Sequence, residues 1–375
     1  MALHFTPSTP TISDLTLHMQ MPEAAGPEQT EIRSTFFPAE WFPQSGVQLT
    51  WPHAATDWAY VLDQVDDCFV HIALEILVRN ELLLIVTPEP DRIRALLHER
   101  IPSRLLPHVR YVECPTNDTW ARDHAFLTLM TEGGPRLLDF RFNGWGDKFP
   151  AELDNQINRR LMDAGLLKGV YESHLDFVFE GGSIESDGRG TLLTTSECLL
   201  SPHRNPDLTQ QQIEERLLRY FHAERVFWLD HGYLAGDDTD SHIDTLARFC
   251  PNNTIAYVRC EDTTDEHFEA LQAMEQQLRS FAAESDLRLI PLPLPAPILD
   301  PDDSHRLPAT YANFLVINGA VLMPTYGQPQ NDDLARTQLQ KAFPKYDIVP
   351  IDCRVLVRQH GSLHCSTMQY PVGVL

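Results

Sequence analysis

Five polar residues with chemically useful side chains recur at similar intervals along the chain. They are separated by 57, 62, 71 and 52 residues and are, in order, Asp123, Glu180, His242, Asn313 and Cys365. A mean spacing of about 60 residues indicates a repeated structural unit, each copy of which delivers one loop to a common centre. Residue-level similarity between the copies is weak, so the spacing by itself only suggests the repeat.

Strand and helix patterns alternate along the chain. The first helix is expected at 57–80 and the first strand at 81–86. Further strands are expected at 109–113, 125–129, 191–194, 254–258 and 314–317. Further helices are expected at 90–99, 152–164, 209–221, 265–283 and 331–343. This pattern predicts an α/β protein, with a poorly ordered arm at 1–35 and a single domain at 36–375.

The chain is strongly acidic. It has 375 residues, of which 53 are acidic and 29 basic, and its formal net charge is −24. Binding to nucleic acid or to an anionic membrane surface calls for a basic face, so we expect neither partner. An acidic cleft concentrates cations, which favours a small cationic substrate, although acidity also simply keeps a protein soluble.

Cysteine usage bears on the compartment. The seven cysteines are sparse and include no C-x-x-C pair, which is atypical of a secreted disulfide scaffold. The N-terminus has no basic segment followed by an apolar core, and no apolar stretch approaches the roughly 18 residues of a membrane span. These features predict a soluble cytoplasmic protein.

The densest polar cluster is Gly236–Asp244, and it has three interpretations. Ser241 and Asp244 match a capping box that would open a helix over 242–249. The aspartates and His242 are also metal ligands in kind, but their spacing fits neither an EF-hand nor a zinc motif, so no metal is expected. In the third interpretation His242 is a general acid and base beside Asp244.

Trp120 and Asp123 belong to an acidic loop, Asn117–Asp123, that follows a predicted strand. A turn with a side-chain cap explains such a loop without any function. Alternatively, Asp123 holds a guanidinium through two parallel hydrogen bonds, and Trp120 lines the pocket by cation–π contact. Both interpretations stay open at this point.

Glu180 and Cys365 are each ambiguous when taken alone. Glu180 precedes two glycines, which either mark a bend or let the backbone approach another group closely. A cysteine such as Cys365 is most often a buried small residue. One thiol, one imidazole and several carboxylates in the same chain change that balance, because together they suit attack on a positively charged carbon.

Taken together, these segments resemble the agmatine deiminase and bacterial peptidylarginine deiminase family of the guanidine-modifying (pentein) superfamily. The matching stretches are Phe37–Trp41, Trp51–Pro52, Asn117–Asp123, Phe142–Gly146, Glu180–Ile184, Leu192–Leu199, Arg204–Pro206, Gly236–Phe249, Tyr311–Phe314 and Leu363–Cys365. They follow the family order and extend over nearly the whole chain. The Gly-Asp-Asp-Thr-Asp block at 236–240 and the Asn-Asp-Thr-Trp-Ala-Arg-Asp block at 117–123 are the most specific.

The resemblance implies a fold and four central residues. The fold would be the pentein fold, five αβ modules arranged as a pseudo-fivefold propeller around a central active-site pocket. By position, Cys365 would be the nucleophile and His242 the acid and base. Asp123 and Asp244 would be the carboxylates that bind the guanidinium.

Three further residues receive weaker assignments from the same resemblance. Glu180 would be another acid of the pocket, and Trp120 and Asp238 would contact the substrate. No metal and no organic cofactor is implied. The partner would be a small cationic guanidine, and a homo-oligomer is compatible with the sequence.

The implied activity is hydrolytic deimination of a small guanidine through a covalent thiouronium intermediate. The favoured substrate is agmatine, which would give N-carbamoylputrescine and ammonia. Departures from the family pattern at 229–235, 359–364 and 366–371 make arginine or peptidylarginine the alternative, with Arg141 or Arg354 to meet the carboxylate. Transfer of the amidino group to an amine and non-catalytic binding of a polyamine are further alternatives.

Overall fold

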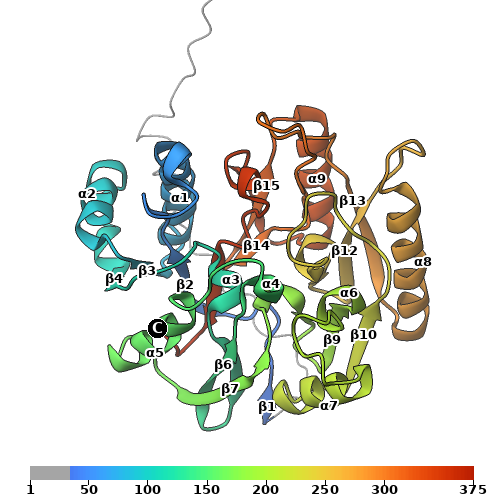
Figure 1. Ribbon diagram of the computed structural model, residues 1–375, viewed down its shortest axis with the longest axis horizontal. Helices are drawn as coiled ribbons and strands as arrows, with labels where there is room; N and C mark the ends of the chain where they lie inside the picture. Colours follow the sequence, from blue (N-terminus) through green and yellow to red (C-terminus); the bar gives the residue numbers. More distant parts are fainter. Residues whose placement is uncertain (1–33) are drawn as a thin grey trace, which may run out of the picture. The chain divides into compact units, whose positions relative to one another are not determined.

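The computed structural model of this protein describes residues 34–375. The arm expected at 1–35 lies outside the described residues except for its last two positions, of which Thr35 forms strand β1 with Phe36. Within the described residues, seventeen strands form five small sheets (Figure 1). None of the helices formed by this part of the chain has the length and apolar character needed to cross a membrane.

The strands of each sheet come from distinct stretches of the chain. The first sheet contains, in spatial order, β17 (Thr367–Pro371), β2 (Gln44–Thr50), β3 (Leu82–Thr87) and β4 (Val109–Glu113). The second contains β1 (Thr35–Phe36), β5 (Leu127–Thr131), β6 (Gly134–Arg141) and β7 (Val170–Val178). The third contains β10 (Arg225–Leu229), β9 (Thr191–Thr195) and β8 (Glu185–Ser186). The fourth contains β11 (Ala247–Cys250), β12 (Thr254–Arg259) and β13 (Arg288–Pro293), and the fifth β14 (Leu315–Ile317), β15 (Ala320–Thr325) and β16 (Asp347–Asp352).

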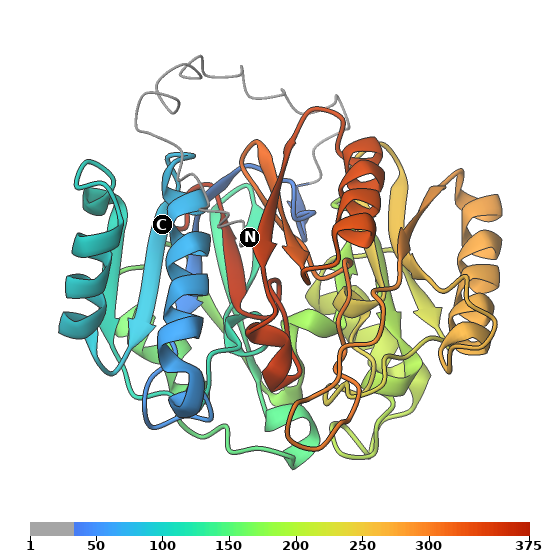
Figure 2. The ribbon, with the colours of Figure 1, turned by 90° about the horizontal axis from the view of Figure 1, so that it is seen from above.

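One connection recurs in every sheet. An antiparallel pair of strands is followed by a helix and then by a strand that lies parallel to the second member of the pair, as in β11, β12, α8 and β13. In the first sheet the pair joins the two ends of the described chain, because β17 lies antiparallel to β2 (Figure 2). The parallel strands β3 and β4 complete that sheet. This fivefold recurrence confirms the expected α/β architecture of five modules.

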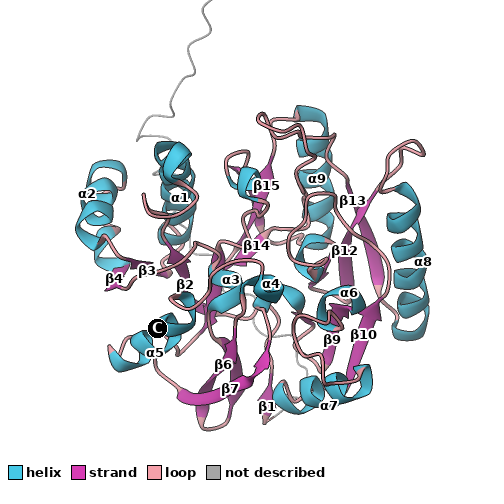
Figure 3. Ribbon diagram, viewed as in Figure 1, coloured by secondary structure: helices cyan, strands magenta, loops and turns pink. Residues whose placement is uncertain are grey.

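The longer helices lie on the outer side of the strands (Figure 3). They are α1 (Leu62–Leu77), α2 (Pro90–Arg100), α5 (Ile157–Asp163), α7 (Gln210–Tyr220), α8 (Phe268–Ser285) and α9 (Pro329–Ala342). Each buries a stripe of apolar residues at helical spacing, such as Ile213 and Leu217 in α7. Three single-turn helices lie in the loops and are α3 (Ala121–His124), α4 (Gly144–Asp147) and α6 (Ser196–Leu199).

The helix expected at 242–249 is wrong. Ile243–Thr245 is a single 3-10 turn, η5, and Ala247–Cys250 is strand β11. Ser241 cannot cap a helix here, because its backbone is left-handed with φ 62° and its hydroxyl donates to Glu197 at 3.0 Å. Residues 241–250 are buried throughout, which suits a strand packed on both faces.

Candidate active site

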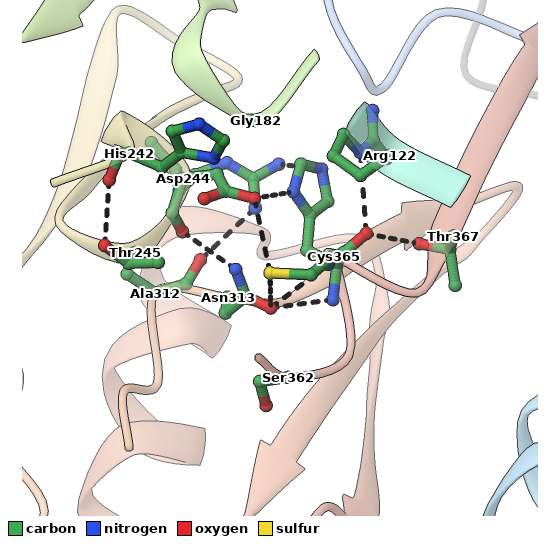
Figure 4. A network of polar contacts seen from close by, with 12 residues as sticks. Arg122, Gly182, His242, Asp244, Thr245, Ala312, Asn313, Ser362, Cys365 and Thr367 are labelled. Carbon is green, nitrogen blue, oxygen red and sulfur yellow. Dashed lines mark hydrogen bonds and ion pairs between the residues drawn. The ribbon is translucent and has the colours of Figure 1, made fainter. Parts of the chain in front are cut away.

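Cys365 lies in the buried loop that leads into β17, and 6% of its surface is exposed. The side chain of Asn313 organises this loop. Its Oδ1 accepts hydrogen bonds from the backbone N–H groups of His364 at 2.9 Å and Cys365 at 3.3 Å, and it lies 3.4 Å from the Cys365 Sγ (Figure 4). Burial and the carboxylates of Asp244 and Asp123 raise the pKa of the Cys365 thiol well above its usual value.

Asp244 belongs to the turn η5 and is fully buried beside Cys365. Its Oδ2 lies 3.9 Å from the Cys365 Sγ and 2.7 Å from Nδ1 of His364. Burial by itself would raise the pKa of Asp244, but contacts with His364, His242 and Arg248 outweigh burial and lower it. The other carboxylate oxygen, Oδ1, is buried and has no hydrogen-bond partner.

Asp123 comes from α3 and is held by two neutral donors. Trp145 donates its Nε1–H to Oδ2 at 2.9 Å, and the backbone N–H of Gly182 donates to Oδ1 at 2.9 Å. Burial raises the pKa of Asp123 to about 6, although the nearby His242 ring acts in the opposite direction. The side chain of this residue is therefore both fixed in position and easily protonated.

His242 is fully buried, and neither of its ring nitrogens has a hydrogen-bond partner. Its Nδ1 lies 3.7 Å from Oδ1 of Asp123. Burial would lower the pKa of His242, but Asp123, Cys198 and Glu180 raise it to about 10. The ring therefore carries a proton at neutral pH.

Gly182 marks the point where three of these groups converge. A Cβ atom on this residue would lie 2.6 Å from Nδ1 of His242, 2.8 Å from Oδ1 of Asp123 and 3.2 Å from Oδ2 of Asp244. Such distances leave no room for a side chain. The second glycine of the Glu-Gly-Gly motif thus keeps clear the space between an imidazole and two carboxylates.

Glu180 lies close to His242, and its carboxylate is not free, because it is paired with Arg204. It is fully buried, and its two oxygens accept from Nε of Arg204 at 3.0 and 2.9 Å. Arg204 also donates to Asp240 at 2.6 Å and to the carbonyl of Thr239 at 2.8 Å. The Glu180 carboxylate therefore holds an arginine that pins the Gly236–Asp244 loop.

Residues 36–371 match the Porphyromonas-type peptidyl-arginine deiminase family. The chain belongs to this family. The resemblance found in the sequence, to agmatine deiminases and bacterial peptidylarginine deiminases, is thereby confirmed.

Similar proteins carry two kinds of name. A protein of Vibrio parahaemolyticus named "Putative agmatine deiminase" is 34% identical over 357 residues, which cover 90% of this chain and 96% of the relative. The crystal structure of the "Putative Arginine Deiminase" of Porphyromonas gingivalis is 51% identical, with a TM-score of 0.85, and the match covers 91% of this chain and 99% of that chain. A C. jejuni agmatine deiminase with substrate bound is 37% identical, with a TM-score of 0.84 and coverage of 91% and 97%.

Trp120 and Asp238, the two residues that the sequence predicts to contact substrate, differ in their exposure to solvent. Trp120 is 5% exposed, donates to Asp118 at 3.1 Å and packs closely against Gly361 of the cysteine loop. The side chain of Asp238 is 41% exposed and lies 3.5 Å from Nδ1 of His360. Burial raises the pKa of Asp238. Within residues 34–375, no hydrogen bond or ion pair joins Trp120 or Asp238 to Cys365, so their roles stay predictions.

Sequence reasoning assigned no role to Trp145 and His364. It named Asn313 only as one of the five spaced polar residues, and Gly182 only as one of two glycines that mark a bend or a close backbone approach. Each lies inside a stretch that matches the family, and that membership is the signal that points to them. Their contacts are long-range: Asn313 and Cys365, for example, are 52 positions apart. Spacing and residue type alone do not reveal such contacts.

Two groups of side chains among residues 34–375 have donor atoms close enough to hold a metal ion. One is Glu180, Cys198 and His242, and the other is Glu40, Glu185 and His364. In the first, Glu180 is paired with Arg204, and in the second both glutamates are paired with Arg248. A bound cation would have to displace these buried guanidinium groups.

Proposed function

We propose that this protein is a hydrolase that removes one nitrogen from a small guanidine as ammonia, with Cys365 as the nucleophile. The observation that supports it most directly is a set of buried side-chain atoms without hydrogen-bond partners on His242 and Asp244, two residues that lie beside Gly182. These are both ring nitrogens of His242 and Oδ1 of Asp244. Buried polar atoms are rarely left unpaired, so a polar substrate is the natural partner for them.

A guanidinium fits this space in charge and in shape. It is planar, it offers N–H donors along its edges, and carboxylates bind it through charge-assisted hydrogen bonds. In the proposal, Asp123 and Asp244 bind the nitrogens of the cation, and one face of its central carbon is directed at Cys365. The short distances from the Gly182 position to both carboxylates support this arrangement.

The first half of the proposed reaction forms a carbon–sulfur bond. The raised pKa of Cys365 means that the free protein holds a neutral thiol, so the bound cation must assist formation of the thiolate. The sulfur attacks the guanidinium carbon, and protonated His242 donates a proton to the leaving nitrogen. The leaving nitrogen departs as ammonium with the proton released by the thiol, a thiouronium remains on Cys365, and His242 is left neutral.

The second half breaks the carbon–sulfur bond. A water molecule attacks the thiouronium carbon and gives up one proton to His242 as the ring acts as a base. The carbon–sulfur bond then breaks, Cys365 leaves and regains a proton, and the ureido product is released. Over the whole cycle one guanidinium and one water become one ureido group and one ammonium ion.

Agmatine is the proposed substrate, and arginine or a peptidyl arginine is the alternative. The net charge of −24 favours a doubly cationic molecule, and an agmatine deiminase is 37% identical to this chain. The 51% identity to a protein named as an arginine deiminase favours the alternative. Of the two cations considered for an arginine carboxylate, Arg354 is already paired with Asp352 at 2.6 Å, which favours agmatine.

The test measures ammonia and ureido product from agmatine, arginine and an arginyl peptide. Cys365→Ala should abolish turnover, whereas Cys260→Ala, which removes a buried thiol that donates to the Asp262 carbonyl, should leave it unchanged. Turnover of agmatine alone supports the favoured substrate, and turnover of arginine or the peptide supports the alternative. If Cys365→Ala retains full turnover, the proposal fails; if the wild type binds agmatine without turnover, the protein is a binder.

A further inference from the structure

His364, the residue before Cys365, lies between two buried carboxylates. Its Nδ1 is 2.7 Å from Oδ2 of Asp244, and its Nε2 is 2.7 Å from Oε2 of Glu40. The side chain is 2% exposed. The ring thus connects an acid of the proposed guanidinium site to an acid from the start of the described chain.

Arg248 extends this connection into a cluster of buried charges. It lies in β11, just after the turn that carries Asp244, and its Nη2 is 2.5 Å from Glu40 and 3.0 Å from Nε2 of His364. Its Nη1 donates to the carbonyl of Phe314 at 2.6 Å, next to Asn313. A second carboxylate, that of Glu185, accepts from Nε of the same guanidinium.

The cluster therefore ties together the loops that carry the three central groups of the site. His364 belongs to the Cys365 loop and contacts the Asp244 turn and Asn313, and Arg248 contacts the Asn313 loop through the Phe314 carbonyl. Every charged member is buried, and removing one partner of such a set leaves the others uncompensated. The ring of His364 is consequently held in one orientation.

We propose that His364 is a positioning residue that fixes the Asp244 carboxylate beside Cys365 for substrate binding, an inference that rests on the proposed function. The Nδ1–H of His364 binds Oδ2 and prevents rotation of the carboxylate, while Glu40 and Arg248 hold the far side of the ring. The oxygen that His364 holds also lies 3.9 Å from the Cys365 Sγ, and the other oxygen, Oδ1, is buried and has no hydrogen-bond partner. Substrate affinity then depends on a residue that does not contact the substrate.

Two substitutions to amide side chains distinguish a hydrogen-bonding role of His364 toward Asp244 from a role in packing alone. In His364→Asn the side-chain N–H₂ occupies the place of Nδ1 and can still donate to Asp244. In His364→Gln the longer side chain reaches toward Glu40, in the place of Nε2, and leaves Asp244 without its donor. Both variants lose the imidazole ring, so thermal unfolding is expected to report similar destabilisation for the two.

The experiment compares kcat/KM of both variants for the substrate that the wild type turns over, and the Kd of that substrate in the Cys365→Ala background. We expect His364→Gln to lose about tenfold or more relative to His364→Asn in both measurements, the effect of one charge-assisted hydrogen bond. Equal losses that follow the loss of thermal stability would overturn the proposal, as would unchanged values for His364→Gln. If the wild type turns over no guanidine, the proposed function fails first and this inference with it.

Discussion

Asp123 and Asp244 are the same residue type at the same depth of burial, yet their surroundings differ in charge. Asp123 is bound by two neutral groups, the indole N–H of Trp145 and the backbone N–H of Gly182. Asp244 is bound by His364, which lies against the Arg248 cluster. Burial raises the pKa of Asp123 to about 6, whereas the hydrogen bond from His364 and the nearby His242 and Arg248 outweigh burial and lower the pKa of Asp244.

This difference in pKa shows two ways in which a buried carboxylate can be arranged to bind a cation. The protein itself supplies the positive charge that keeps Asp244 ionised. Asp123 lacks a cluster of that kind beside it and has protonated His242 at 3.7 Å as its nearest cation. The bound guanidinium is thus the main missing counter-charge for Asp123.

The largest expected effects come from neutralising each acid in turn. Asp123→Asn and Asp244→Asn should each lower kcat/KM by about 10²–10⁴-fold, because each removes charge-assisted hydrogen bonds to the proposed guanidinium. Steady-state kinetics with the preferred guanidine measures this. Asp176→Asn is the control, because that carboxylate is exposed and pairs only loosely with Arg216 at 3.6 Å.

The same two variants should differ in stability. The folded protein binds the Asp123 proton more tightly than the unfolded chain, so stability falls as pH rises from the usual value of 3.8 to about 6. Asp123→Asn removes that penalty, up to about 3 kcal/mol at pH 7. Asp244→Asn should instead lower the free energy of unfolding by about 1–3 kcal/mol, because it removes the charge from a buried hydrogen bond with His364. Equal changes in both variants would contradict the comparison.

Gly182→Ala tests the space between the two acids. The added methyl group would clash with His242, Asp123 and Asp244, and displacement of such groups by about 1 Å lowers turnover about 10²-fold. The rate of ureido-product formation measures the loss. Gly133→Ala is a matched control, because the nearest atom to its Cβ would be 3.7 Å away. If Gly182→Ala keeps full activity, the reacting carbon does not bind in the space between His242, Asp123 and Asp244.

Trp145→Phe removes one of the two neutral donors of Asp123, and its effect is measured by the pH dependence of kcat/KM. The indole N–H stabilises the ionised carboxylate, so its removal raises the pKa of Asp123, and the acid limb of kcat/KM should move upward from pH 6 by about one unit. Trp228→Phe, which removes an indole bond to Glu214 at 2.7 Å, is the control and should leave the limb in place. If the acid limb of the kcat/KM profile does not move in Trp145→Phe, the titration of a group other than Asp123 causes that limb.

Asp238→Asn is expected to have the smallest effect. The half-exposed carboxylate pairs loosely with His360, and an exposed ion pair contributes at most about 1 kcal/mol, so KM for agmatine should rise by no more than about fivefold. The value of kcat should not change. A fall in kcat instead would show that Asp238 acts at the reacting carbon.

The sequence predicted the regular elements well where the pattern was local. Val109–Glu113 is a strand as expected, and the repeat of polar residues corresponds to five recurring modules. The helix expected at 242–249 failed, because the capping signal of Ser241 is overridden by its left-handed backbone and by pairing of β11 with β12.

The proposed catalytic residues were found from the family motifs, whereas the groups that position them were not. His364 and Glu40 are 324 positions apart, and Arg248 reaches His364 over 116 positions. Trp145 reaches Asp123 from a left-handed backbone, φ 58°, which no residue pattern predicts. Contacts of this kind depend on how the modules pack, and one sequence carries no direct record of it.

The most direct test of the account is mass spectrometry of the protein quenched in acid during turnover of agmatine or the preferred guanidine. The account predicts an adduct on the peptide that contains Cys365, heavier by the mass of the substrate less one ammonia. In a single turnover, His242→Ala should form this adduct more slowly, because the leaving nitrogen lacks its proton donor. Sustained turnover with an unmodified Cys365, or an adduct on Cys198 instead, would contradict the central claim.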